Sequence, residues 1–148
     1  MPRLLGDPVV RLYVVVYLLL VLKIAAVGTY TSILRLGRKV YATPEDYALQ
    51  GLTRKTTVDE DIERARRAHR NDLENILPFF VVGFCYLLTG PSWNGAAIYL
   101  IGYLVARVAH SVFYIRSMQP HRTIAFTLGG VLTLAMVVQT FLAVARAG

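Results

Sequence analysis

Two stretches of the sequence place polar and charged side chains at helical spacing. Intervals of three, four and seven residues put such side chains on one face of a helix. The first stretch holds Arg67, Arg70, Asn71 and Glu74, and the second holds Arg107, His110, Ser111 and Tyr114. Arginine forks pair with carboxylates, while a carboxylate accepts hydrogen bonds from an ammonium group. This inventory predicts a site for a small anionic zwitterion.

Glutathione fits the inventory because it carries two carboxylates, one ammonium group and a thiol, although a phospholipid headgroup satisfies the same groups. A free thiol is mostly protonated at neutral pH, and an arginine held against the sulfur in a low-dielectric site favours the thiolate. Arg122 is the candidate for that role, because it stands at an expected helix start, where backbone N–H groups also favour negative charge. The thiol would come from the ligand, since the single cysteine, Cys85, lies among apolar residues.

Several of these residues also have a simpler structural interpretation. Arg70 and Glu74 stand four residues apart and can form an ion pair along one helix. The Arg107 side chain can extend along apolar surface to reach the membrane interface. A lone histidine such as His110 is more often structural than catalytic.

Four apolar segments must position these residues, each close to the roughly 20 residues that a helix needs to cross a bilayer. Helices are expected at about 9–34, 69–88, 95–115 and 123–145, with a polar loop at about 35–68. The composition, 55% hydrophobic and 17% charged, and a mean hydropathy of +0.50 agree with a membrane protein. The predicted fold is all-α, a single membrane domain over residues 1–148 built as a bundle of four transmembrane helices.

The distribution of basic residues predicts the orientation of this bundle. Nine of the sixteen Lys and Arg residues fall between Arg35 and Arg70, together with six acidic residues. Because basic loops stay in the cytoplasm, both termini are expected on the lumenal or outer side. The net charge of +7 does not indicate nucleic acid, since no aromatic stacking pattern accompanies the basic residues. The first segment is interpreted as a retained helix rather than a cleaved signal peptide, because Lys23 interrupts the approach to any cleavage site.

Three motifs, in order along the chain, resemble the MAPEG family, the membrane-associated proteins in eicosanoid and glutathione metabolism. Residues 38–46 read RKVYATPED, residues 63–79 read ERARRAHRNDLENILPF, and residues 107–114 read RVAHSVFY. The resemblance covers nearly the whole chain, from about Lys23 onward. Three motifs in the family's order are far more specific than a single short pattern.

The resemblance implies a homotrimer of four-helix bundles in the endoplasmic reticulum or another intracellular membrane. Glutathione would lie between subunits at the cytoplasmic side, together with a hydrophobic or lipid second substrate and without a metal ion. The family's glutathione positions match Arg35, Arg70, Asn71, Glu74, His110, Tyr114 and Arg122. Arg67 and Arg107, on the two polar helical faces, complete the predicted binding set.

Two activities of the family compete for this chain. Glutathione transferases of the family conjugate glutathione to electrophiles and reduce lipid hydroperoxides, whereas its prostaglandin E synthases isomerise prostaglandin H. For the synthase, Asp46 and Thr123 join Arg122 as candidate catalytic residues. We favour the transferase because Phe126 and Gly130 stand where the synthase pattern has a tyrosine and a glutamine. A lipid-presenting member without catalysis is the third alternative, and the retained glutathione positions disfavour it.

Overall fold

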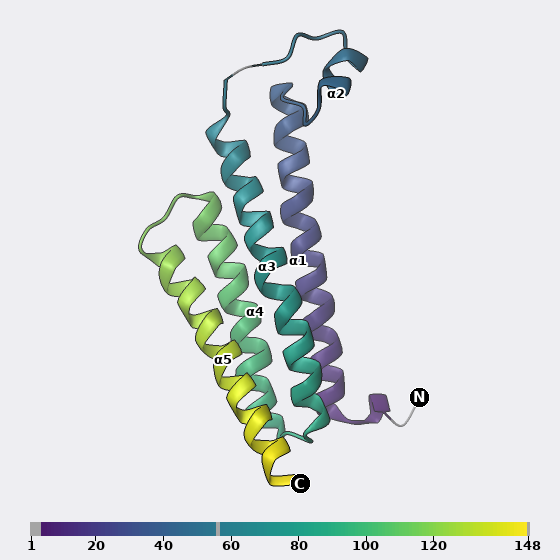
Figure 1. Cartoon of the computed structure of the whole chain (residues 1–148), viewed down its shortest axis with the longest axis vertical. Coiled ribbons are helices and arrows are strands. Elements are labelled where there is room, and N and C mark those ends of the chain that lie inside the picture. Colours follow the sequence, from purple (N-terminus) through teal and green to yellow (C-terminus); the bar gives the residue numbers. More distant parts are fainter. Residues whose placement is uncertain (1–3, 56, 148) are drawn as a thin grey trace.

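The computed structural model describes residues 4–55 and 57–147, and every regular element in these ranges is a helix. After a short 3₁₀ turn, the elements are α1 (Pro8–Arg38), α2 (Pro44–Leu49), α3 (Glu60–Leu88), α4 (Trp93–Ile115) and α5 (His121–Ala147) (Figure 1). All but α2 are long and apolar enough to cross a membrane. The predicted all-α bundle of four transmembrane helices is therefore confirmed.

Capping residues explain where the helices begin. Asp7 accepts a hydrogen bond from the backbone N–H of Val9 at 2.7 Å, and Asp59 accepts one from Ile62 at 3.2 Å. Because Asp59 caps α3, this helix starts nine residues before the start expected from hydropathy, at residue 69. The predicted segment began with the charged residues 69–74 but left out the earlier turns of α3, which are also polar and were assigned to the loop.

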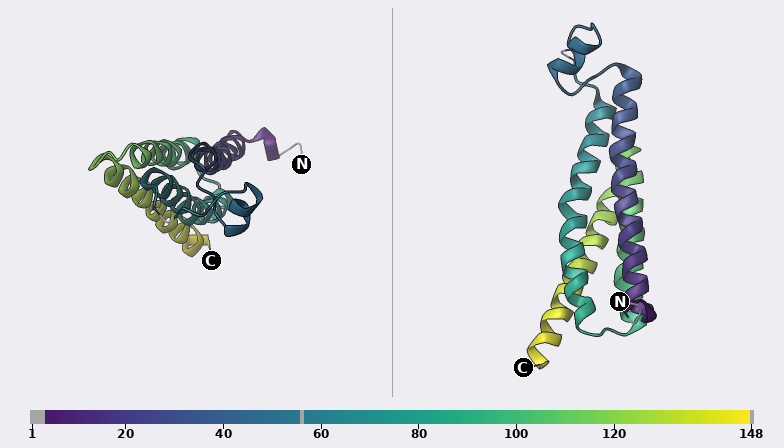
Figure 2. Two further views of the ribbon diagram at one scale, coloured as in Figure 1. Left: turned by 90° about the horizontal axis from the view of Figure 1, so that it is seen from above. Right: turned by 90° about the vertical axis from the view of Figure 1, so that its right-hand side faces the viewer.

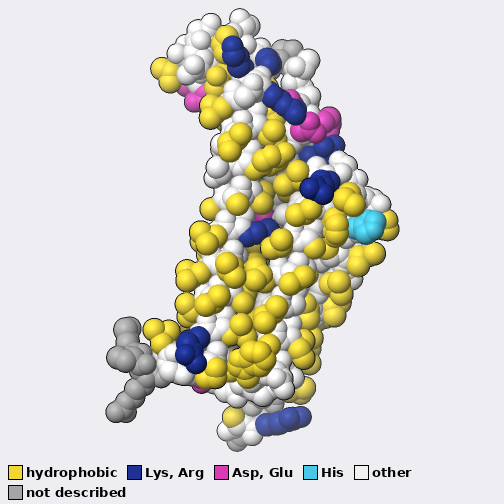
Figure 3. Space-filling view, turned by 180° about the vertical axis from the view of Figure 1, so that it is seen from behind, with side chains coloured by type: hydrophobic (Ala, Val, Ile, Leu, Met, Phe, Trp, Pro, Cys, Tyr) yellow, Lys and Arg dark blue, Asp and Glu magenta, His cyan; other side chains and the backbone are white. Residues whose placement is uncertain are grey.

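The four long helices run antiparallel in succession and pack unevenly. Helix α1 packs against α3 and α4, while α5 packs against α4 and α3 and makes no contact with α1 within the described residues. Figure 2 shows α1 and α5 on different sides of the bundle. The surface is largely hydrophobic along the helices, whereas charged side chains gather toward the end that carries α2 (Figure 3).

Tyrosines from two neighbouring helices hold the middle of α3. Pro78 lies inside this helix and lacks an N–H, so the carbonyl of Glu74, four residues earlier, loses its usual helical partner. The Tyr103 hydroxyl donates to the carbonyl of Asn75 at 2.9 Å, and its ring stacks on Phe79 with centroids 3.5 Å apart. On the other side, the Tyr17 hydroxyl donates to the carbonyl of Phe79 at 2.6 Å. These contacts fix the helix immediately beside its polar stretch.

An exposed cluster of charges ties the end of α1 to the start of α3. The Arg38 guanidinium donates to Asp59 at 2.6 Å and to Asp61 at 2.8 Å, and the Lys55 ammonium donates to the Arg38 carbonyl at 2.6 Å. The hydrogen bond from Arg38 holds the pKa of the Asp59 carboxyl below its usual range. We call Arg38, Asp59 and Asp61 the loop clasp, because they close the segment that contains α2.

Candidate functional site

A buried cluster of charges joins three helices in the interior of the bundle. The Asp72 carboxylate of α3 is fully buried and forms ion pairs with Lys23 of α1 and with Arg107 of α4, the latter at 2.9 Å. The Ser111 hydroxyl donates to the same carboxylate at 3.3 Å. We call Lys23, Asp72 and Arg107 the ion triad. The ion triad was not predicted from the sequence, although a lysine within an apolar segment indicates that a carboxylate is needed nearby.

Arg107 belongs to the predicted binding set, and the structure places it inside the bundle. Its side chain is 1% exposed, so the interpretation that it extends to the membrane interface is wrong. Its Nη2 donates to Asp72 and also to the side-chain oxygen of Asn71 at 2.7 Å. Arg107 therefore holds Asn71, another predicted ligand residue, within one hydrogen-bonded group.

Three further predicted residues form an aromatic and cationic group where α4 meets α5. The His110 ring is buried and packs against the Tyr114 ring at 5.5 Å, while the Arg122 guanidinium lies 4.5 Å from the centre of the Tyr114 ring. Phe126 of α5 closes the group, 5.8 Å from His110. Thr123 is exposed, and its hydroxyl lies 3.0 Å from the side-chain amide of Gln119. The positive charge of Arg122 is therefore packed against the aromatic ring of Tyr114.

The predicted residues at the start of the polar face of α3 are exposed. Arg67 lies 4.0 Å from Glu60, an ion pair at the limit of contact. Among the described side chains, no ion pair joins Arg70 to Glu74, so the simpler structural interpretation of these two residues is not observed. Glu74 instead borders a cavity of about 270 Å³ that Arg107 and Gly130 also line.

Arg35 lies on another side of the molecule, between α1 and α3. A pocket of about 580 Å³ there is lined by Arg35, Arg66 and His69 together with small residues of α1. The Arg35 Nε and the His69 Nδ1 are buried and lack a hydrogen-bond partner. Such orphaned polar atoms are expected to meet a ligand, because leaving them unpaired costs free energy. His69 was not among the predicted site residues, although it lies within the most specific motif.

Asp46, a predicted catalytic residue, has a structural role at the start of α2. Its carboxylate accepts a hydrogen bond from the backbone N–H of Thr43 at 3.3 Å, and the Thr43 hydroxyl accepts one from the backbone of Asp46. This reciprocal pair is a capping box at the start of α2. Asp46 also lines a pocket of about 320 Å³ with Arg35 and is exposed, so it remains open to a ligand.

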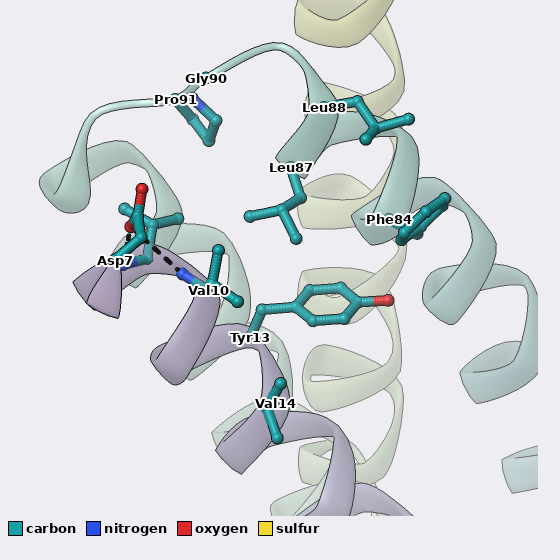
Figure 4. A pocket seen from close by; sticks show the side chains of 10 residues that line it. Asp7, Val10, Tyr13, Val14, Phe84, Leu87, Leu88, Gly90 and Pro91 are labelled. Carbon is teal, nitrogen blue, oxygen red and sulfur yellow. Dashed lines mark hydrogen bonds between the residues drawn. The ribbon is translucent and has the colours of Figure 1, made fainter. Parts of the chain in front are cut away.

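A larger groove lies at the opposite end of the bundle, near the termini. It measures about 620 Å³ and is formed by the start of α1, the end of α3 and the turn at Gly90 and Pro91 (Figure 4). Apolar side chains such as Leu87 and the ring of Tyr13 face it. Its carboxylate, Asp7, is occupied as the cap of α1. The groove therefore offers a surface for hydrocarbon rather than a catalytic centre.

The structure is that of a multi-pass membrane protein. Its four apolar helices run antiparallel, the ion triad joins three of them, and arginines lie toward one end. Comparison with known proteins specifies the class further. The model of the MAPEG family matches residues 13–142. The chain is 36% identical over 143 residues to prostaglandin E synthase of Homo sapiens, which covers 96% of this chain and 94% of that protein. It is 41% identical over 119 residues to microsomal glutathione S-transferase 1 of Sus scrofa, covering 77% of each. The chain belongs to the MAPEG family, as its motifs predicted.

Proposed function

We propose that this protein is a glutathione-dependent membrane enzyme that uses the glutathione thiolate to attack hydrophobic electrophiles and to reduce lipid hydroperoxides. The observation that carries the proposal is the position of Arg122. It lies in the first turn of α5, half-buried, over the neutral ring of Tyr114. A guanidinium supported by an aromatic ring keeps its full charge, and the helix N-terminus adds to it, so both favour a thiolate over a thiol.

The thiolate would perform two related reactions. In conjugation, the sulfur forms a bond to an electrophilic carbon, and the leaving group departs with the electron pair of the bond that breaks. In peroxide reduction, the sulfur attacks one oxygen of the O–O bond and releases an alcohol after protonation. A second glutathione then displaces hydroxide from the resulting sulfenic acid, giving glutathione disulfide and water. Arg122 stabilises the anionic sulfur before either attack.

The distribution of predicted ligand residues supports a site shared between two copies of the chain. Arg35 lies in a pocket of α1 and α3, whereas Arg122 packs on α4, and α1 and α5 do not touch within the described residues. A single ligand molecule would meet both arginines if α1 of one copy packed near α5 of another. The homotrimer implied by the family is therefore our proposed assembly, in the endoplasmic reticulum or a similar membrane, with the site facing the cytoplasm.

Prostaglandin E synthase is the second candidate activity, because a relative of that name matches nearly the full chain. Two positions near the site, Phe126 and Gly130, favour the transferase. Phe126 brings a ring without a hydroxyl to His110, and Gly130 brings no side chain to the cavity that Glu74 borders. Both positions lack the hydrogen-bonding group that the synthase pattern supplies. An endoperoxide would find fewer polar contacts there than in a synthase.

The proposal is tested by two activities measured on one detergent preparation. Conjugation of glutathione to a chlorinated dinitrobenzene is compared with conversion of prostaglandin H to prostaglandin E. Arg122→Ala is expected to abolish both the conjugation and the ultraviolet thiolate absorbance of bound glutathione, while Arg122→Lys retains part of each. Rapid endoperoxide conversion with poor conjugation would establish the synthase instead. Absence of saturable glutathione binding would refute both activities and favour the lipid-presenting alternative.

A further inference from the structure

The ion triad carries one more positive charge than negative charge inside the bundle. Lys23 and Arg107 share the single carboxylate of Asp72, whose other polar contact is the Ser111 hydroxyl. Buried ions that lose their partner are strongly destabilising, so the contacts that each cation makes besides Asp72 bear on how well it is held. Lys23 contacts Asp72, whereas Arg107 also reaches Asn71. The two cations therefore differ in what else they touch.

The contact between Arg107 and Asn71 fixes the orientation of the Asn71 amide. A guanidinium has five N–H donors and no acceptor, so only the oxygen of the Asn71 side chain can face it. Arg107 Nη2 donates to this oxygen at 2.7 Å and to the backbone oxygen of Asn71 at 3.2 Å. The amide nitrogen, on the opposite side of the group, is left as the end that can meet a ligand. Asn71 is half-buried and one helical turn from Glu74.

We propose that Arg107 is a positioning residue that determines how Asn71 recognises glutathione. Anchored by Asp72, it turns the Asn71 amide so that the nitrogen donates to a carboxylate of the ligand, and it prevents the oxygen from accepting a bond from the ammonium group. The ammonium group is then left to Glu74. This inference rests on the proposed glutathione-dependent function. It adds that Asn71 acts as a donor to the ligand and that Arg107 determines this orientation of the amide.

Two matched substitutions separate positioning from structural support. Arg107→Met and Lys23→Met each leave Asp72 paired with one cation, so both variants keep a balanced ion pair in the bundle. Only Arg107→Met releases the Asn71 oxygen.

The measurement is the Kd for glutathione by calorimetry in detergent, with KM and kcat for conjugation. Arg107→Met is expected to raise Kd and KM about five- to tenfold, the loss of one hydrogen bond, with kcat retained. Lys23→Met is expected to stay within about twofold of the unmodified protein, because Lys23 does not contact the amide.

A double-variant cycle and an isosteric change complete the test. If Arg107 acts through Asn71, the variant with both Arg107→Met and Asn71→Ala binds glutathione no more weakly than Asn71→Ala alone. Asn71→Asp keeps an oxygen toward Arg107, balances the charge of the buried group and replaces the donating nitrogen by an oxygen. It is expected to fold and to bind glutathione more weakly than Asn71→Ala, because a carboxylate then faces a carboxylate. This variant decides the question even where Arg107→Met does not fold.

Each result has a definite consequence. Equal losses in Lys23→Met and Arg107→Met, additive losses in the double variant, or unchanged or tighter binding by Asn71→Asp would overturn the positioning role and leave the proposed function intact. An unmodified protein that shows no saturable glutathione binding would overturn the proposed function, and this inference with it.

Discussion

Two groups of basic and carboxylate side chains, the ion triad and the loop clasp, differ in composition and in surroundings. In the ion triad, one buried carboxylate serves two cations, whereas in the loop clasp one guanidinium serves two carboxylates in contact with water. Asp72 is fully buried, while the side chains of Arg38 and Asp61 are 41% and 51% exposed. The bond lengths are similar, 2.9 Å for Arg107 to Asp72 and 2.8 Å for Arg38 to Asp61.

The comparison teaches that distance alone does not measure what an ion pair contributes. Water screens the loop clasp and competes for both partners, so pairs of this kind contribute little to stability. The ion triad has no such competitor, and removing one member leaves the others in a medium where an unpaired charge is costly. The buried group is therefore expected to hold the bundle and position ligand residues, and the exposed group to order a loop.

The largest effect is expected from Asp72→Asn, which leaves the buried Arg107 and the mostly buried Lys23 without a carboxylate. The bundle should lose about 3–5 kcal/mol of stability, because neither cation retains a counter-charge. Unfolding in mixed detergent micelles with increasing dodecyl sulfate measures the loss. A midpoint equal to that of the unmodified protein would show that water or lipid reaches the triad and that the contrast with the loop clasp is wrong.

Removing one cation of the ion triad should cost less than removing its carboxylate. Lys23→Met and Arg107→Met each leave one complete ion pair, so each should lose about 1.5–3 kcal/mol, the range for a hydrogen bond to a charged group. The same unfolding experiment measures both variants beside Asp72→Asn. Should either variant unfold as readily as Asp72→Asn, charge balance would not be the principle that organises the triad.

The hydrogen bond of the Tyr103 hydroxyl is uncharged, and its removal should cost less stability than a change in the ion triad and more than a change in the loop clasp. Tyr103→Phe keeps the ring on Phe79 and removes the hydrogen bond to the Asn75 carbonyl, so it should cost about 1 kcal/mol. Tyr99→Phe is the matched control, because the Tyr99 ring packs edge-on against Tyr86 on the same helix pair. Equal unfolding midpoints for the two variants would indicate that the hydrogen bond from Tyr103 to the Asn75 carbonyl does not contribute to stability.

The smallest effect on global unfolding is expected from the loop clasp. Asp59→Asn keeps an oxygen that caps α3 and removes the charge that faces Arg38, so the unfolding midpoint should hardly change. Hydrogen exchange over residues 39–55 should nevertheless quicken about two- to threefold, and high salt should produce a similar change in the unmodified protein. If exchange in this segment were the same in Asp59→Asn and at high salt as in the unmodified protein, the clasp would not order the loop.

The pH dependence of the loop clasp follows from the lowered pKa of Asp59. Because this carboxyl is more acidic in the folded protein, its contribution is complete above the unfolded pKa and is lost as the pH falls through the folded value. Hydrogen exchange of the loop, corrected for its intrinsic pH dependence, should therefore stay constant from neutral pH and rise below about pH 4. A rise near pH 6 would point to a histidine instead.

Much of the fold was predictable because it depends on local composition. Four apolar stretches of sufficient length identify four membrane helices, and the motif order identifies the family. Helix boundaries were harder to predict where part of a helix is polar. The first turns of α3 are charged, yet they are helical and are capped by Asp59. The short helix α2 also went unpredicted, since six residues within a polar loop give no hydropathy signal.

The sequence by itself determined that polar side chains would gather on one face of α3 and one face of α4, because helical spacing is a property of the chain. It could not decide which of them would meet a ligand and which would meet each other. Only tertiary packing brought Lys23, 49 residues away along the chain, to Asp72 and turned Arg107 inward to Asn71. The physical reason is that a buried charge must find a partner in space, and the identity of that partner depends on which helices are neighbours.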